Sequence, residues 1–235
     1  MLESKPYTIS PLGDSALIVD FGNVIDTATN KRVISVYRSL LNPSLEWMIE
    51  AVPAYSSLTI YYDPMQFSRH NGSISLFDQI RNEVEKRLDS SIDNYETQSV
   101  MHKIPVCYDD EFGIDLQETA RITGLSAEEI IKLHTSVRYR VYMLGFLPGF
   151  AYMGETDERI ASPRKQQPRP RVEAGSVGIA GRQTGIYPFA SPGGWQIIGR
   201  SPVMLFNIHK EKPALFSAGD TVQFYQISKD EFESY

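Results

Sequence analysis

A cluster of basic residues is the first feature of the sequence that could do chemistry. Between positions 159 and 171 the chain carries five basic residues and no acidic one: Arg159, Arg164, Lys165, Arg169 and Arg171. The planar fork of arginine matches the oxygens of a carboxylate or a phosphate. Prolines within the segment restrict it and reduce the entropy lost when it closes on a ligand. The segment is therefore a candidate anion-binding site, whereas its charge alone favours a solvated loop.

Polar and aromatic side chains that could complete such a site lie nearby in the sequence. His134 could act as a base or a hydrogen-bond donor near neutral pH, although a structural histidine satisfied by its neighbours has the same signature. Other candidates lie on glycine-rich turns and are typical of a small-molecule pocket: Tyr152, Gln183, Thr184, Ser191 and Trp195.

The common motifs of nucleotide, metal and hydrolase sites do not occur in the sequence. It contains no GxxxxGK[ST] pattern, and the GxxGxxG formed at Gly175, Gly178 and Gly181 lacks the strand and helix that would give it meaning. HExxH and GxSxG are missing as well. Cys107 is the only cysteine, which excludes an internal disulfide and a cysteine-based zinc site, and its apolar neighbours indicate a buried packing residue.

The stretch from Gly145 to Gly199 must position these side chains. It holds 10 of the 16 glycines and 6 of the 14 prolines of the chain. Glycine permits positive φ and proline fixes φ, so in a folded region rich in both these residues determine the backbone conformation of each turn. Regular apolar residues, such as Ile179 and Trp195, argue against a disordered linker. We expect short strands and shaped loops around a concave surface.

The C-terminal part, residues 99–235, is predicted to be an all-β domain with a short helical insert. Strand patterns occur at Arg138–Phe146, Ser176–Ala180, Gly194–Ile198, Met204–Phe206 and Thr221–Ile227, at spacings typical of a closed or nearly closed barrel. Two short helices between Asp115 and His134 resemble a helix-turn-helix, but four acids against two bases there give the wrong charge for facing phosphates. We therefore interpret them as a structural pair.

The N-terminal part, residues 1–98, is predicted to be a two-layer α+β domain. Strand and helix patterns follow one another in the order ββαββα, with apolar stripes on both helices. The polar residues Asp89–Ser99 mark the expected domain boundary.

Composition and charge bound the class of protein. The 235 residues carry a net charge of −6, which argues against general nucleic-acid binding. The first residues lack the apolar core of a signal peptide, and no apolar run is long enough to span a bilayer. We expect a cytoplasmic protein with no nucleic-acid or membrane partner.

Several long motifs carry a resemblance to a known family. HTSVRYRVYMLGFLPGFAYMG, then SPR at Ser162–Arg164, then PRPRVEAGSVGIAGRQTGIYPFASPGGWQIIG resemble the family of the 5-oxoprolinase B subunit. That family includes the KipI-type inhibitors of a sporulation histidine kinase and has also been labelled allophanate hydrolase subunit 1. PLGDSAL near the start and IPVCYDDEFGIDL in the middle extend the resemblance over nearly the whole chain.

The resemblance implies a cyclophilin-like barrel and a carboxyltransferase-like subunit of a multi-subunit enzyme, inactive alone. The reaction would be the ATP-dependent hydrolysis of 5-oxo-L-proline to L-glutamate through a phosphorylated lactam oxygen. Partners would be 5-oxoprolinase subunits of the A and C types, with ATP shared with or bound by a partner. No metal and no biotin attachment region is evident in the chain. A regulatory protein that inhibits a sensor histidine kinase, and a carboxyltransferase or allophanate-hydrolase subunit, are the alternatives.

The resemblance also implies which residues line the site. Arg164 and Arg171 would bind a carboxylate or a phosphate, and His134 or Tyr152 would transfer or position a proton. The other expected lining residues are Phe146, Pro148, Gly149, Phe150, Gly175, Ser176, Gln183, Thr184, Gly185, Pro192, Gly193, Gly194 and Trp195.

Overall fold

The computed structural model describes residues 5–67, 74–91 and 99–235. Contacts divide the chain into two compact units, Met1–Gln98 and Ser99–Tyr235. Most of the boundary segment expected at Asp89–Ser99 lies outside the described residues. Each unit is described separately below.

The first unit contains a four-stranded antiparallel sheet in the order β1-β2-β4-β3. Its elements, in chain order, are β1 (Thr8–Pro11), β2 (Ala16–Asp20), α1 (Thr27–Leu41), β3 (Met48–Pro53), β4 (Ser57–Tyr62), α2 (Pro64–Phe67) and α3 (Leu76–Ser91). The short helix α2 was not expected from the sequence.

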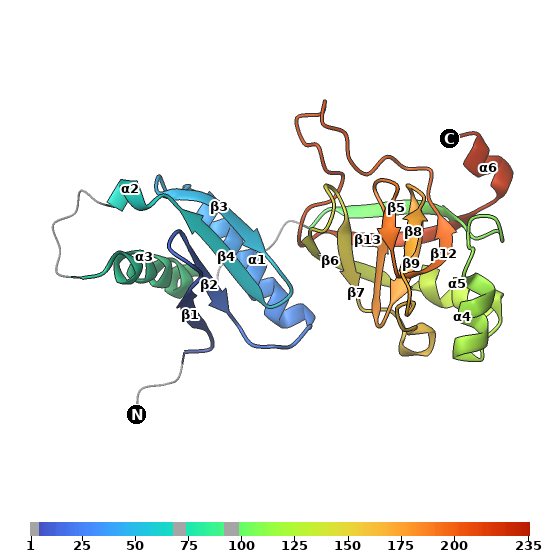
Figure 1. Cartoon of the computed structure of the whole chain (residues 1–235), viewed down its shortest axis with the longest axis horizontal. Helices are drawn as coiled ribbons and strands as arrows, with labels where there is room; N and C mark the ends of the chain where they lie inside the picture. The colour runs from blue at the N-terminus through green and yellow to red at the C-terminus, as the bar shows by residue number, and fades with distance from the viewer. Residues whose placement is uncertain (1–4, 68–73, 92–98) are drawn as a thin grey trace. The chain divides into compact units, whose positions relative to one another are not determined.

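Helices α1 and α3 pack beside each other and share one core with the sheet (Figure 1). Leu17 and Val19 alternate inward from β2, and Leu58 and Ile60 do so from β4. Asp26 caps α1 because its carboxylate accepts the backbone N–H groups of residues 28 and 29. Amphipathic helices on an alternating sheet explain this half of the fold.

The second unit contains a closed seven-stranded barrel in the order β10-β7-β6-β13-β5-β12-β9, and a separate β11-β8 pair. Its elements are β5 (Met101–Cys107), α4 (Leu116–Thr123), α5 (Ala127–Ser136), β6 (Arg138–Leu144), β7 (Ala151–Gly154), the 3₁₀ turn η1 (Glu158–Ile160), β8 (Arg169–Val172), β9 (Ser176–Ala180), β10 (Gln183–Ile186), β11 (Ser191–Gly193), β12 (Gln196–Arg200), β13 (Thr221–Ile227) and α6 (Lys229–Glu233).

The strands of the second unit close into a barrel (Figure 1). Aliphatic and aromatic side chains form its core. β5 and β13 pair in parallel, and the other barrel neighbours pair antiparallel. Cys107, on β5, is fully buried, as its apolar neighbours predicted. The predicted closed or nearly closed β structure is confirmed as a closed barrel.

The helical insert is a structural pair against the barrel, as predicted. Ser126 and Glu129 form a reciprocal capping box at the start of α5. Gly124 ends α4 with φ of 72°, a conformation that glycine adopts without steric cost. α4 packs against β12 and α5 against β13. Asp115 precedes α4 but makes no capping bond, because its carboxylate binds elsewhere.

One expected barrel strand is absent. Met204–Phe206 was predicted to be a strand, but this stretch contributes only a single bridge, between Phe206 and Ala214. Pro213 precedes Ala214 and accepts a hydrogen bond from Asn207 N–H, but it has no N–H to return one, so the ladder cannot extend regularly on that side.

Candidate functional site

A cavity of about 270 Å³ lies on the second unit and gathers much of the predicted site. Its lining comes from the turn after β6, from β7, from the segment before β8 and from the β10–β12 region. The lining residues are Phe146, Phe150, Tyr152, Arg164, Lys165, Pro168, Tyr187, Pro192, Gly193, Gly194 and Trp195.

Aromatic rings form the wall of this cavity. Phe150 is almost fully buried at the centre, and its ring meets those of Tyr187 and Trp195 edge to face, with centroids 5.4 and 5.6 Å away. Tyr152 contacts the rings of both Phe150 and Trp195. Such edge-to-face contacts hold rings in fixed orientations. The wall is therefore a rigid apolar surface suited to a flat molecule.

Phe146 lies at the rim of the cavity. Its side chain is 62% exposed, and its ring meets that of Phe150 at 5.7 Å. Phe146 has φ of 69°, and it is the one non-glycine among the described residues with positive φ. A bulky residue in the left-handed region is strained, and such strain is concentrated at functional sites.

Arg164 supplies the cavity with a positive charge. Its guanidinium carbon lies 5.9 Å from the centroid of the Trp195 indole ring, within the range of a cation–π contact. Arg164 is exposed to solvent at the edge of the cavity. A guanidinium held over an aromatic face can still present its N–H groups to an anion.

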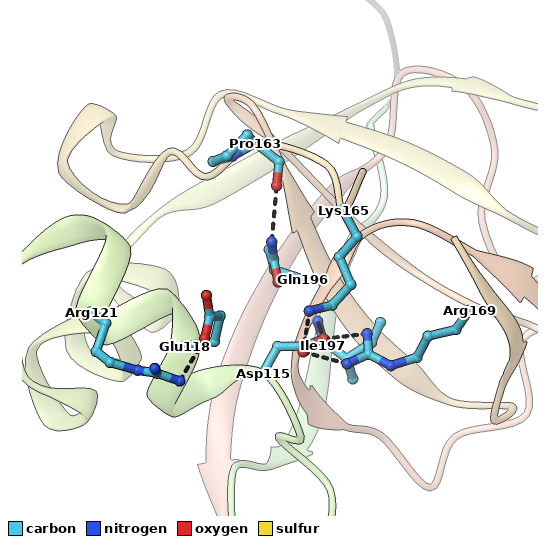
Figure 2. A network of polar contacts seen from close by, with 8 residues as sticks. All are labelled: Asp115, Glu118, Arg121, Pro163, Lys165, Arg169, Gln196 and Ile197. Atoms are coloured by element: carbon cyan, nitrogen blue, oxygen red, sulfur yellow. Dashed lines mark hydrogen bonds and ion pairs between the residues drawn. The ribbon is translucent and has the colours of Figure 1, made fainter. Parts of the chain in front are cut away.

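The other four basic residues of the predicted anion-binding segment are ion-paired. Arg159 pairs with Asp157, and Arg171 pairs with Glu173, at N–O distances of 2.7 and 2.6 Å. Lys165 and Arg169 both pair with Asp115 (Figure 2). Within the part of the chain that the structure describes, Arg164 is thus the cation of this segment that has no carboxylate partner.

The structure places the second predicted anion binder, Arg171, outside the cavity lining. Its side chain is 69% exposed and bonded to Glu173, a surface pair two residues along the chain. This pairing lowers the pKa of Glu173, and the Arg171 guanidinium is hydrogen-bonded to the Glu173 carboxylate. Arg171 and Arg164 are not brought together in one site.

His134 lies in the barrel interior and is fully buried. Its Nε2 lies 3.0 Å from the Thr184 hydroxyl oxygen, and its Nδ1 lies 2.8 Å from the Tyr108 hydroxyl oxygen. Thr184 donates its own hydrogen to the carbonyl of Gly178 at 3.0 Å, so it must accept from His134 Nε2–H. Nδ1 then accepts from Tyr108.

This arrangement gives His134 a structural role. Burial lowers its pKa to about 3, so the ring is neutral at physiological pH. Its ring also stacks on Phe224 with centroids 4.6 Å apart. Every polar atom of the ring is satisfied inside the core. Neither His134 nor Thr184 reaches the cavity.

The remaining predicted lining residues fall elsewhere. Gly175 lines a second cavity of about 480 Å³, which is bordered by Arg200 and Phe232. Gly149 packs against Phe206. Four others lie outside the first cavity, on barrel strands or in the turn after β6: Pro148, Ser176, Gln183 and Gly185.

Pro168 and Tyr187 were missing from the expected lining residues, and Lys165 was predicted only as one of the five cations of the basic segment. Lys165 and Pro168 belong to the basic, proline-containing segment, so their proximity to Arg164 was a usable signal. Tyr187 lies in the glycine-rich stretch from Gly145 to Gly199, and its phenol ring was a signal that could have placed it in the cavity wall. Burial raises the pKa of Tyr187 and that of Tyr152, with Arg164 acting in the opposite direction, so both are neutral phenols at physiological pH.

No group of three or more histidine, cysteine, aspartate or glutamate side chains that could hold a metal ion occurs among residues 5–67, 74–91 and 99–235. Over those same residues, every helix is too short or too polar to cross a bilayer.

The second unit is thus a closed β-barrel that carries an aromatic-lined cavity with Arg164 at its edge. The chain belongs to the carboxyltransferase domain family, subdomains C and D, whose model matches residues 7–216.

Three relatives illustrate the family. The B subunit of 5-oxoprolinase from Bacillus subtilis (strain 168) is 45% identical over 97% of this chain and 96% of its own. The B subunit of 5-oxoprolinase from Escherichia coli O157:H7 is 37% identical over 91% of this chain and 93% of its own. The crystal structure of TTHA0988 superimposes with a TM-score of 0.78 at 37% identity. The match covers 92% of this chain but only 40% of the TTHA0988 chain, which is longer.

Proposed function

We propose that the protein is a subunit of an ATP-dependent 5-oxoprolinase that converts 5-oxo-L-proline to L-glutamate. Support comes from membership of the carboxyltransferase domain family and from similarity, over nearly the full length, to proteins named as the B subunit of 5-oxoprolinase. The cavity adds an independent argument, because its size and chemistry suit a small planar carboxylate.

The observation that carries the proposal is the position of Arg164. 5-Oxoproline is a five-membered lactam that bears one carboxylate. Arg164 is held over Trp195 without a carboxylate of its own, so its N–H groups are available to that carboxylate. The lactam ring would then lie against the aromatic wall of Phe150, Tyr152 and Tyr187.

Tyr152 is the residue we assign to the lactam group. Burial raises the pKa of its phenol, so it stays protonated at physiological pH and its O–H can donate a hydrogen bond to the lactam oxygen. In this position the Tyr152 O–H would orient the lactam oxygen, which is the atom phosphorylated in the reaction below. His134, sealed in the core, takes no part in the reaction.

ATP is assigned to a partner protein, because the sequence lacks a P-loop. In the proposed reaction the lactam oxygen attacks the γ-phosphorus and ADP leaves. Water then attacks the ring carbonyl carbon, the ring C–N bond breaks, and the nitrogen takes up a proton. Hydrolysis of the resulting acyl phosphate releases phosphate and L-glutamate. Partner subunits of the A and C types complete the assembly in this proposal.

Reconstitution tests the proposal. The chain is mixed with A-type and C-type partner subunits, ATP and 5-oxoproline, and L-glutamate is measured. We expect glutamate only when all subunits are present, and none from this chain alone. An equal rate from the partners without this chain would refute the proposal.

A further inference from the structure

Asp115 is a buried carboxylate at the junction of three elements. It precedes α4 and is 2% exposed. One oxygen accepts Arg169 Nη1 at 2.7 Å, and the other accepts Arg169 Nη2 and lies 2.8 Å from Lys165 Nζ. The backbone N–H of Ile197, on β12, donates to the same carboxylate at 2.8 Å (Figure 2). The charge is paired and hydrogen-bonded, as a buried charge must be.

The segment that carries Arg164 is held on both sides of that residue. The side-chain amide of Gln196 donates to the Pro163 carbonyl at 3.1 Å, and Lys165 N–H donates to the Gly194 carbonyl at 2.7 Å. The ion pairs from Lys165 and Arg169 to Asp115 complete the attachment. Arg164 itself makes no ion pair with a described carboxylate, so its place over Trp195 is set by these flanking attachments.

The charges explain why a carboxylate is needed at this point. Burial alone would raise the pKa of Asp115, but hydrogen bonds from Arg169, Lys165 and Ile197 outweigh it and lower the pKa below its ordinary value. Asp115 is therefore ionised at physiological pH. One negative charge faces two positive ones, so the cluster keeps one excess positive charge beside the cavity. That excess favours an anionic ligand.

We propose that Asp115 is a positioning residue for the anion site: by holding Lys165, the residue next to Arg164, and Arg169 further along, it fixes the segment that carries Arg164, so that Arg164 faces the cavity over Trp195. The ligand used below rests on the proposed function, whereas the positioning itself does not. An acid 54 residues from Arg169 in the sequence thus determines the geometry of the site.

A double-mutant cycle tests whether Asp115 acts through Arg164. Trp195 lies in the cavity and Trp47 in the other unit, so a Trp47→Phe background makes Trp195 fluorescence a direct reporter of binding. 5-Oxoproline is titrated into the full chain with and without Asp115→Asn, and again with Arg164→Gln added. We expect Asp115→Asn to raise Kd at least tenfold when Arg164 is present and less than twofold when it is absent.

Limited trypsin digestion gives a second measurement that needs no ligand. Trypsin cuts after arginine and lysine in segments that open locally. We expect the wild-type segment to resist cleavage and Asp115→Asn to be cut after Arg164 or Lys165. Asp157→Asn is the matched control, because it breaks the exposed pair with Arg159 near the same segment and should leave positions 164 and 165 uncut.

The outcomes separate this inference from the proposed function. An unchanged Kd in Asp115→Asn, or an equal loss in both Arg164 backgrounds, overturns the inference. If wild-type Trp195 fluorescence does not respond to 5-oxoproline, this chain alone does not bind the proposed substrate, and the trypsin result decides the inference: cleavage of Asp115→Asn after Arg164 or Lys165 supports positioning, and resistance overturns it. If Asp115→Asn does not fold, Arg169→Gln is used in its place. We expect Arg169→Gln to raise the Kd for 5-oxoproline threefold or more and to be cut by trypsin after Arg164 or Lys165.

Discussion

The guanidinium of Arg164 lies over the indole ring of Trp195, with its central carbon 5.9 Å from the ring centroid. The contact leaves the hydrogen-bonding edge of the guanidinium available, since a cation–π contact uses its face. The neighbouring cations Lys165, Arg169 and Arg171 are each ion-paired with a carboxylate. Arg164 therefore becomes the point of attachment for an anion in a cavity whose other walls are aromatic.

Replacement of Arg164 should weaken binding of the ligand carboxylate. A hydrogen bond to a charged group contributes about 1.5 to 3 kcal/mol, so we expect Arg164→Gln to raise the Kd for 5-oxoproline by about tenfold or more. Arg171→Gln is the matched control, because Arg171 carries the same charge in the same segment but is exposed and paired with Glu173. Calorimetric titration checks both variants. Equal losses would show that net charge, not position, determines affinity.

Gly193 and its neighbour Gly194 allow a second comparison between a test variant and a matched control. A Cβ on Gly193 would lie 2.5 Å from the Tyr187 hydroxyl oxygen and 2.9 Å from its ring, and Tyr187 is buried against Phe150. A Cβ on Gly194 would meet Pro168 at 3.6 Å, an ordinary contact. We expect Gly193→Ala to displace Tyr187 into the cavity and to raise Kd about tenfold. Gly194→Ala should change it less than twofold.

The same titration measures both glycine variants, and thermal unfolding shows whether the barrel is intact. A Gly193→Ala chain that folds and binds like the wild type would remove Tyr187 from the cavity wall as we describe it.

Local patterns in the sequence were enough to predict much of this architecture. The capping box at Ser126 and Glu129 and the glycine end of α4 depend on residues a few positions apart, which a sequence displays directly. The basic segment and the Gly145–Gly199 stretch also identified the region that forms the cavity.

Pairings between distant residues could not be predicted in the same way. Asp115 has the sequence signature of a helix cap, yet its carboxylate binds Arg169, because the barrel brings the two together in space. The basic segment looked uniform, but the structure distinguishes Arg164 from its paired neighbours. Likewise, the sequence puts His134 on a helix but does not say that its side chain turns into the core.

Two substitutions of Phe146 can separate the effect of backbone strain on stability from the effect of its ring on binding. Its φ of 69° is costly for any residue with a Cβ, by about 1 kcal/mol, and free for glycine. Both Phe146→Ala and Phe146→Gly remove the ring from the cavity rim, so both should weaken binding equally. We expect the glycine variant to unfold with a free energy about 1 kcal/mol higher than the alanine variant. Urea unfolding checks this, and a less stable glycine variant would contradict it.

His134 makes the stability of the barrel depend on pH. Its pKa is about 3 in the folded chain against an ordinary value of 6.5, so between these values the unfolded chain binds a proton that the folded chain does not. Stability therefore rises with pH across this window and falls on acidification, by at most about 1.4 kcal/mol per pH unit. Above pH 6.5 neither state binds the proton, and this contribution to the slope vanishes.

Urea unfolding followed by Trp195 fluorescence in the Trp47→Phe background measures this slope for the barrel alone, since Trp195 lies in that unit. Wild type should lose stability steeply between pH 6.5 and 4. His134→Gln should be less stable at neutral pH, because Tyr108 and Thr184 lose their shared hydrogen-bond partner. Its stability should also fall less steeply on acidification, because the contribution of His134 to the pH dependence is gone. His209→Gln, at an exposed histidine, should keep the wild-type slope. An identical slope in wild type and His134→Gln would mean that His134 is not the buried neutral group that its two hydrogen bonds require.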